Sequence, residues 1–291
     1  RDSVASRGLG DVYKRQVVTY NRLEFLKDCV DALKHQTYKN MDIVIVNNGS
    51  TDGTSEWLST NTNIVVINQE NCGGAGGFFS GMKYMFEHDY EALWMMDDDG
   101  LPAKNQLEQL IAISDKYHID YANALVLNRD NKHLMCSGGE YNPKDYENIE
   151  LIPNVVLPFN GTFIKRHVIE KIGFIKKEMF IWGDEREYTA RVKHAGFKMG
   201  TITSAIHYHP AFKGDLRNMI PLCSKWKVGF KPSPRDKIFF RNLGYIDYKY
   251  GTKHFLKYLI YYITHLQFIR IPYLIKYMRM GRNDDFTTKL L

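Results

Sequence analysis

The sequence predicts an α/β fold in which helices flank a mostly parallel central sheet, followed by a helical C-terminal extension. Between about residues 17 and 210, short β-branched runs alternate with segments of helical spacing. This alternation is typical of right-handed βαβ units, which build parallel sheets. Beyond residue 215 the chain is basic and aromatic at near-helical spacing. A length of 291 residues allows one large domain with such an extension.

The first sixteen residues show no sustained period of either kind, whereas "VVTYNR", from Val17 onward, resembles the end of a strand. A buried parallel strand normally carries several more apolar residues before that point. We therefore expect that the natural start is missing and that 1–16 is an unrelated cloning or assembly segment. A natural disordered leader is the alternative. The predicted α/β domain then covers 17–215, and the extension covers 216–291.

The elements of the α/β domain follow from their periods. After the first strand, apolar residues at helical spacing predict a helix over 23–33, and "DIVIVNN" predicts a strand at 42–48. The same reasoning predicts the remaining elements in this order: helix 51–59, strand 64–69, helix 78–88, strand 92–97, helix 104–118, strand 121–127, a strand and a helix within 159–173, helix 182–196 and strand 199–210. Beyond these we expect helices broken by Pro232, Pro234 and Pro272.

Composition excludes some classes of protein and favours others. No uncharged apolar run reaches the roughly 18 residues of a transmembrane helix, and no signal peptide is visible. The four cysteines form no CxxC pair, so we expect free thiols and a cytoplasmic protein. Between Lys225 and Arg282 there are thirteen Lys and Arg against Asp236 and Asp247, a local excess of 13 − 2 = 11. That excess favours an anionic partner.

Four loops that follow predicted strands carry the candidate ligand-binding residues. Ligands on a parallel sheet bind at the carboxyl ends of its strands, so these loops are expected to share one edge. Asn and Asp can hydrogen-bond a base and a ribose, and glycines let the backbone approach a ligand closely. The candidates for nucleotide binding in these loops are Thr19, Tyr20, Asn21, Asn48, Asp52, Gly73, Gly74, Gly76, Gly77, Asp97 and Asp98.

Three adjacent carboxylates follow the apolar run "ALWMM". Side by side they repel one another, and a surface turn gains nothing from three. Because the backbone turns after the strand, Asp97 and Asp99 can both reach a hard cation such as Mg²⁺ or Mn²⁺. A nucleotide diphosphate would complete the coordination of that cation. The triplet therefore predicts a metal and diphosphate site.

Four motifs, "VVTYNR", "IVIVNNGSTDGT", "ENCGGAGGFFSGM" and "WMMDDDG", resemble the sugar-nucleotide half of a family 2 glycosyltransferase with the GT-A fold. The resemblance covers about Val17 to Pro210 and is closest to bacterial rhamnosyl- and galactofuranosyltransferase-like members. It implies metal-dependent, inverting transfer of a sugar from a donor such as UDP-galactofuranose or dTDP-rhamnose. The acceptor would be a glycan or lipid-linked hydroxyl in cell-envelope polysaccharide synthesis. It also assigns the metal to Asp97 and Asp99, whereas Asn47 departs from the Asp of many members.

"FIWGDEREYTAR" resembles the acceptor segment of the same family. The resemblance implies that Asp184 is the catalytic base, with Glu185 as the second candidate, and that Trp182 and Gly183 contact the acceptor. An inverting transfer needs such a carboxylate to take the proton of the acceptor hydroxyl. The alternative is that these acids only suit the start of a helix.

Two histidines end the predicted strand in "AIHYHP". Family members often bring a His from this point to the metal. Alternation puts His207 and His209 on one face, so the pattern does not separate them. We favour His209 because it stands at the end of the strand.

The extension leaves two interpretations open. Its basic and aromatic residues suit an anionic membrane interface, but they suit equally a helical subdomain packed on the catalytic domain with its Lys and Arg in solvent. "RDKIFFRN" resembles a stretch that follows the catalytic domain in this group, which implies that Arg241 faces phosphate.

Two other functions compete with a glycosyltransferase. A sugar-nucleotide nucleotidyltransferase would carry a loop rich in Lys and Arg near the first strand, where this chain has only Arg22. A nucleic-acid-binding protein could use the basic extension, but it would leave the Asp triplet and the glycine run unexplained. We therefore expect no nucleic-acid partner.

Overall fold

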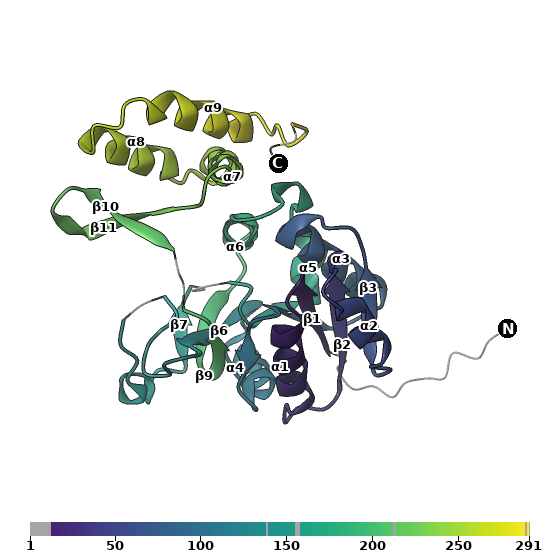
Figure 1. The fold of residues 1–291 in the computed structure, drawn as a ribbon. Helices are drawn as coiled ribbons and strands as arrows, with labels where there is room; N and C mark the ends of the chain where they lie inside the picture. Colours follow the sequence, from purple (N-terminus) through teal and green to yellow (C-terminus); the bar gives the residue numbers. More distant parts are fainter. Residues whose placement is uncertain (1–12, 138, 155–157, 212–213, 289, 291) are drawn as a thin grey trace.

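The computed structural model describes residues 13–137, 139–154, 158–211, 214–288 and 290. A nine-stranded sheet lies at the centre, and helices pack around it (Figure 1). The strands follow the order β3-β2-β1-β4-β8-β6-β9-β5, and β7 pairs with β9. The predicted α/β class with a mostly parallel sheet is confirmed.

The elements of the α/β part lie within a few residues of their predicted positions, with exceptions given below. The strands of the sheet are β1 (Tyr13–Thr19), β2 (Met41–Asn47), β3 (Ile64–Asn68), β4 (Ala92–Asp97), β5 (Leu101–Pro102), β6 (Tyr121–Asn128), β7 (Leu151–Pro153), β8 (Thr162–Lys165) and β9 (Met199–His209). The helices are α1 (Leu23–Lys34), α2 (Thr54–Ser59), α3 (Gly73–Glu87), α4 (Gln106–Tyr117), α5 (Arg166–Ile172) and α6 (Asp184–His194). Two 3₁₀ turns, η1 (Pro143–Tyr146) and η2 (Lys177–Met179), complete this part.

The directions of the strands bring the predicted loops to one edge. Strands β1 to β4 are parallel, and the register places Thr19 beside Asn47 and Val18 beside Asp97. Strand β8 is antiparallel to both β4 and β6, so β6 and its parallel partner β9 point the same way as β4. The end of β9 at His209 therefore shares the edge with the Asp triplet.

The first strand begins earlier than expected. Strand β1 starts at Tyr13, so residues 13–16 belong to the sheet and are not a disordered leader, whereas the expected non-native origin of the segment stays a prediction. The missing apolar residues are replaced by the buried polar residues Arg15 and Gln16, whose hydrogen bonds are only partly satisfied, because Nε of Arg15 and Oε1 of Gln16 find no partner among the described residues. Gln16 is fully buried, and its Nε2 donates to the carbonyl of Gly77 at 3.1 Å. The rest of the proposed leader, 1–12, lies outside the described residues.

The extension is not helical from its start. Strands β10 (Asp215–Ile220) and β11 (Cys223–Phe230) form an antiparallel hairpin, so the prediction of helices was wrong there. Helices α7 (Asp236–Tyr250), α8 (His254–Thr264) and α9 (Arg270–Arg282) follow. Pro272 does not break α9, because it lies in the first turn, where its missing N–H has no helical partner to lose.

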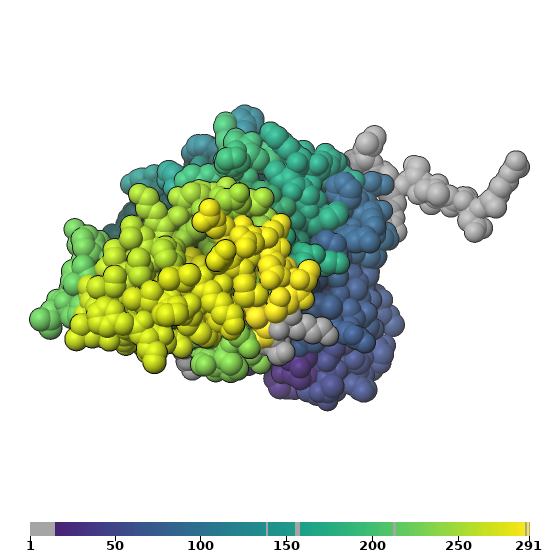
Figure 2. Space-filling model, turned by 90° about the horizontal axis from the view of Figure 1, so that it is seen from above, coloured from purple at the N-terminus to yellow at the C-terminus, as the bar shows by residue number. Residues whose placement is uncertain are grey.

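The extension is packed onto the α/β part. Aromatic and aliphatic side chains of α7, α8 and α9 share one buried cluster with residues of α3, β4 and α6. Figure 2 shows the extension spread over the top of the molecule. The interpretation as a packed subdomain therefore fits the structure, although many apolar side chains of the extension remain exposed. No helix in the described ranges is both long and apolar enough to cross a membrane.

Candidate active site

The Asp triplet is held by Thr19, the last residue of β1, and by Arg22 of the loop that follows. The middle carboxylate, Asp98, is buried and accepts a hydrogen bond from Oγ1 of Thr19 at 2.8 Å. Nη1 of Arg22 lies 3.3 Å from Asp98 and 2.7 Å from Asp99. Arg22 therefore offsets part of the repulsion. This role of Arg22 was not predicted, although the motif "VVTYNR" contains the residue.

The three carboxyls differ in pKa. Burial raises the pKa of Asp97 to about 7, and the charges of Asp99 and Asp98 act in the same direction. Burial also raises the pKa of Asp98 to about 6, against the opposing effects of Arg22 and Thr19. Burial alone would raise the pKa of Asp99, but His209 and Arg22 outweigh it and hold that pKa below its usual value. The site thus favours additional positive charge near Asp97.

The pairing of β5 with β9 brings a histidine to the triplet. Nε2 of His209 lies 3.1 Å from Oδ1 of Asp99, and Nδ1 lies 2.8 Å from the carbonyl oxygen of Pro210. Burial lowers the pKa of His209, but contacts with Asp99 and Cys136 outweigh this and raise it to about 10. Because Nδ1 of His209 faces the carbonyl of Pro210, Nε2 is oriented toward Asp99. Metal-binding histidines are commonly oriented by such a contact of the second ring nitrogen.

The second histidine has a different environment. His207 is fully buried, and its Nδ1 lies 3.2 Å from Oε1 of Gln106. A Cβ added to Gly100 would lie 2.2 Å from Nε2 of His207, so the ring packs against the triplet loop. Burial lowers the pKa of His207 to about 3. The geometry therefore favours His209 over His207 as a metal ligand, an assignment that stays a prediction.

The residues present fit a divalent cation that shares its ligands with a substrate. No three His, Cys, Asp or Glu side chains in the described part of the chain already form a metal site. However, the buried Oδ1 of Asp99 lies only 3.1 Å from Nε2 of His209, so two of the candidate ligand atoms are already adjacent. Mg²⁺ is commonly held by one or two carboxylates together with substrate phosphates. Asp97, Asp99 and His209 are the side chains that would hold such an ion.

Two predicted nucleotide contacts are engaged inside the protein instead. Asn48 is buried; its Nδ2 donates to the carbonyl of Gly73 at 3.0 Å, and its Oδ1 accepts from Nε2 of Gln69 at 2.7 Å. It therefore joins two loops and is not available to a base or ribose. The hydroxyl of Thr19 is likewise used by Asp98. Both residues shape the site without facing it.

The first two loops are bound to each other. Asp52 accepts hydrogen bonds from the backbone N–H of Leu23 at 3.0 Å and of Thr54 at 3.2 Å, so it caps both α1 and α2. Oδ1 of Asn21 accepts from the N–H of Thr51 at 2.7 Å. These caps fix the loops but occupy the side chains expected to bind nucleotide. Tyr20, in contrast, is 46% exposed and remains available to a ligand.

The glycine run is the start of a helix and not an open loop. A Cβ on Gly73 would lie 2.1 Å from the carbonyl oxygen of Phe180, and one on Gly77 would lie 2.4 Å from Cγ1 of Val18. A Cβ on Gly76 would also meet a neighbour, whereas the space at Gly74 is open. Gly73 and Gly77 therefore allow α3 to pack closely on other elements, Gly76 leaves room for Cys72 at the start of the same helix, and only Gly74 fits the predicted approach to a ligand.

The segment that precedes Asp184, the predicted base, has an unusual backbone conformation. Phe180 and Trp182 have φ values of 66° and 60°, a region that non-glycine residues rarely adopt. Asp184 then begins α6 and is buried. Burial raises its pKa well above the usual value, and the charges of Glu185 and Asp97 act in the same direction. The base candidate is therefore within reach of the charge of Asp97.

The second base candidate has a structural contact. Oε2 of Glu185 accepts a hydrogen bond from the N–H of Gly183 at 2.9 Å. The alternative role of these acids at a helix start therefore applies to Glu185. Trp182 is half-buried, with Nζ of Lys231 5.0 Å from its ring centre. These roles toward an acceptor stay predictions.

Arg241 does not face a phosphate site, contrary to expectation. It is buried, and its Nη2 donates to the carbonyls of Glu178 at 3.1 Å and Met179 at 3.3 Å. The neighbouring Asn242 binds the same segment, and sequence reasoning missed it. The only signal was its place in "RDKIFFRN".

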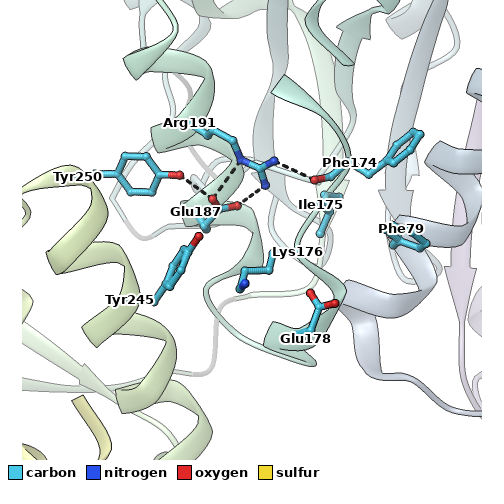
Figure 3. A pocket seen from close by; sticks show the side chains of 9 residues that line it. All are labelled: Phe79, Phe174, Ile175, Lys176, Glu178, Glu187, Arg191, Tyr245 and Tyr250. Carbon is cyan, nitrogen blue, oxygen red and sulfur yellow. Dashed lines mark hydrogen bonds and ion pairs between the residues drawn. The ribbon is translucent and has the colours of Figure 1, made fainter. Parts of the chain in front are cut away.

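A separate pocket of about 360 Å³ lies where α6 faces α7 (Figure 3). None of the predicted site residues lines it. Glu187 accepts hydrogen bonds there from Arg191 and from the hydroxyl of Tyr250, each at 2.6 Å. The pocket thus marks a polar part of the contact between the α/β part and the extension.

The fold and the acidic edge of its sheet define a glycosyltransferase of the GT-A type. The chain belongs to glycosyl transferase family 2, whose family model matches residues 16–173. The predicted resemblance is thereby confirmed.

Relatives and solved structures agree with this assignment. Galactofuranosyltransferase GlfT1 of Mycobacterium tuberculosis H37Rv is 27% identical over 255 residues, which cover 82% of this chain and 83% of the relative. Staphylococcus aureus TarS in complex with UDP-GlcNAc superposes with a TM-score of 0.58 at 13% identity, covering 94% of this chain and 88% of that one. The mannosyltransferase PcManGT of Pyrobaculum calidifontis, in complex with GDP-Man and Mn²⁺, gives a TM-score of 0.51 at 15% identity, covering 96% and 76%.

Proposed function

We propose that this glycosyltransferase moves a sugar, with inversion, from a nucleotide-diphosphate donor to a hydroxyl of a glycan or lipid-linked acceptor. The observation that carries the proposal is the meeting of the Asp triplet with His209 at one edge of the sheet, where Nε2 of His209 lies 3.1 Å from Oδ1 of Asp99. The buried Asp184 is within reach of the charge of Asp97, which helps to raise its pKa. Solved structures with this fold include complexes with UDP-GlcNAc and with GDP-Man and Mn²⁺. These complexes support a nucleotide-sugar donor and a divalent cation for this chain.

In the proposed reaction, the acceptor hydroxyl gives its proton to Asp184 as its oxygen attacks the anomeric carbon of the donor. A bound Mg²⁺ or Mn²⁺ would stabilise the negative charge of the departing diphosphate. Asp97, Asp99 and His209 would hold this ion, while Thr19 and Arg22 keep the triplet in place. Trp182 and Gly183 would contact the acceptor.

We propose UDP-galactofuranose as the first donor to test and dTDP-rhamnose as the second, in synthesis of a cell-envelope polysaccharide. The support is the similarity to GlfT1, which carries galactofuranosyltransferase in its name. We further propose that the protein is cytoplasmic and located at the inner face of the membrane. The four cysteines, all within the described ranges, form no disulfide, which suits a reducing compartment. A nucleotidyltransferase gains no support, because Arg22 is engaged with the triplet.

A test combines thermal unfolding with transfer to a glycan acceptor. Ligands that bind only the folded state raise its midpoint temperature. We expect UDP-galactofuranose to raise the midpoint in the presence of Mn²⁺ and to lose this effect when EDTA is added. No stabilisation by any nucleotide sugar, with or without Mn²⁺, together with no sugar transfer, would contradict the proposal.

A further inference from the structure

The most exposed apolar side chains of the extension gather at one end. Leu222, at the tip of the β10–β11 hairpin, is fully exposed, and Leu266 and Ile269, between α8 and α9, are 77% and 89% exposed. Oγ1 of Thr264 donates to the carbonyl of Met219 at 3.0 Å, so the end of α8 is fixed beside the hairpin. Both tips lie at the left end of the extension in Figure 1.

Further apolar side chains on the same elements are half exposed, namely Leu216, Trp226 and Phe268. We call five of these residues the docking end: Leu222, Trp226, Leu266, Phe268 and Ile269; Leu216 pairs with Gly229 at the base of the hairpin and is not part of it. Single exposed apolar residues need no explanation, but a group of this size marks an interaction site.

Basic side chains accompany the docking end. Lys225 and Lys227 flank Trp226 on β11, and Lys257 lies exposed near the start of α8, toward the base of the hairpin, where the hydroxyl of Tyr258 donates to the carbonyl of Gly229. Among the described residues, none of these three lysines forms an ion pair. Their charge belongs to the local excess of 11 in the extension. The partner that fits this surface is therefore both apolar and negatively charged.

We propose that the docking end binds the surface of an anionic lipid membrane. Exposed apolar side chains at loop tips can enter the boundary between headgroups and acyl chains, while nearby lysines contact lipid phosphates. Trp226 suits the same boundary because its ring is apolar and its N–H is polar. The inference concerns a surface apart from the triplet and does not depend on the proposed function.

The test is co-sedimentation of the full chain with phosphatidylglycerol-containing vesicles and with neutral phosphatidylcholine vesicles. We expect binding to the anionic vesicles that falls as salt rises, because salt screens attraction within about 10 Å. The double variant Leu222→Asp/Ile269→Asp should bind at least about tenfold more weakly, since it removes two apolar side chains and adds negative charge. Both positions are exposed, so the fold should persist.

The matched control is Ile149→Asp, which changes an exposed isoleucine of the α/β part. It should bind vesicles like the parent. Equal binding to neutral vesicles, unchanged binding of the double variant, or absence of binding would each overturn the inference. So would self-association of the parent that Leu222→Asp/Ile269→Asp abolishes, because a second copy would then be the partner.

A different observation carries a second inference. Asn242 of α7 is fully buried, and its Nδ2 donates to the carbonyls of Met179 at 2.9 Å, Ile181 at 3.0 Å and Trp182 at 2.9 Å. These carbonyls belong to the segment with positive φ values that precedes Asp184. Rare backbone conformations persist only where the surroundings hold them. Asn242 supplies such contacts from the extension.

The same segment also touches the donor side of the site. The carbonyl of Phe180 accepts a hydrogen bond from the N–H of Ala75 at 3.1 Å, at the start of α3. A displacement of residues 179–183 would therefore disturb both the start of α3 and the start of α6.

We infer that Asn242 is a positioning residue that fixes Asp184 through residues 179–183, an inference that rests on the proposed function. Asn242→Ala is expected to lower kcat by about 10–100-fold, because misplacement of a reacting group by about 1 Å costs a factor of this size. Mn²⁺-dependent donor binding should be nearly unchanged. The control, Leu243→Ala, truncates the next buried residue of α7, whose side chain forms no hydrogen bond to the segment.

The test of this positioning role combines transfer kinetics, calorimetry with the donor and thermal unfolding. Even if Leu243→Ala lowers the midpoint temperature of unfolding as much as Asn242→Ala does, it should keep the kcat of the parent. The inference would be overturned if Asn242→Ala kept the kcat of the parent. It would also be overturned if kcat fell in both variants in proportion to the loss of the midpoint temperature of unfolding. Parent activity in Asp184→Asn would instead show that the proposed base is wrong, so the two failures can be told apart.

Discussion

Asp97→Asn and Asp99→Asn are each expected to weaken Mn²⁺-dependent binding of the nucleotide sugar by at least about a hundredfold, since each removes a carboxylate that a hard cation needs. Asp98→Asn should have a milder effect, because this buried residue contacts Thr19 and Arg22. Titration calorimetry with donor and Mn²⁺ provides the measurement. Equal and slight effects of all three substitutions would contradict the assignment of the outer pair.

Thermal unfolding without metal separates the two outer acids further. Burial and neighbouring charges raise the pKa of Asp97, so its ionised form opposes folding at neutral pH. Asp97→Asn should therefore leave the metal-free protein as stable as the parent or more so. The pKa of Asp99 is lowered by His209 and Arg22, so Asp99→Asn should destabilise it. A stabilising effect of Asp99→Asn would show that these contacts contribute little.

The sequence predicted the strand-end site because two regularities point to it. Periods of helix and strand give the βαβ alternation, and parallel strands necessarily bring their carboxyl ends to one edge. The position of Asp97 immediately after an apolar run was therefore sufficient to place the triplet. His209 could be favoured for the same reason, since it ends a strand of the same direction.

Individual side-chain roles in the loops could not be predicted in this way. An Asn after a strand has the same appearance whether it binds a ribose or, as Asn48 does, joins two loops. Likewise, glycines permit close approach without specifying what approaches. Gly73 and Gly77 face protein, and only their contacts with Phe180 and Val18 reveal it.

The extension shows a further limit of local patterns. Basic and aromatic residues at near-helical spacing suggested helices throughout, but residues 215–230 form a hairpin that packs on α8. The contact of Phe230 with Tyr258 and Tyr261 is long-range, so no local sequence period could predict it. Asn242 was missed for the same reason, because its acceptors lie about 60 positions earlier in the chain.

Asp184→Asn is expected to reduce sugar transfer by roughly 10²–10⁴-fold, the usual contribution of a general base. Donor binding should stay near that of the parent, because the substitution does not change the triplet. Burial and the charges of Glu185 and Asp97 raise the pKa of Asp184, so the parent should lose activity as pH falls through this raised pKa and the carboxylate becomes protonated. Asp184→Asn should lack that acid limb.

Glu185→Gln is the matched control, since the amide oxygen of Gln can still accept the hydrogen bond from Gly183. It should transfer sugar at nearly the parent rate. Transfer kinetics over a range of pH, with donor affinity measured separately, distinguish the two acids. If Asp184→Asn retains the parent rate while Glu185→Gln loses it, the base is Glu185, and its contact with Gly183 then has a catalytic as well as a capping role.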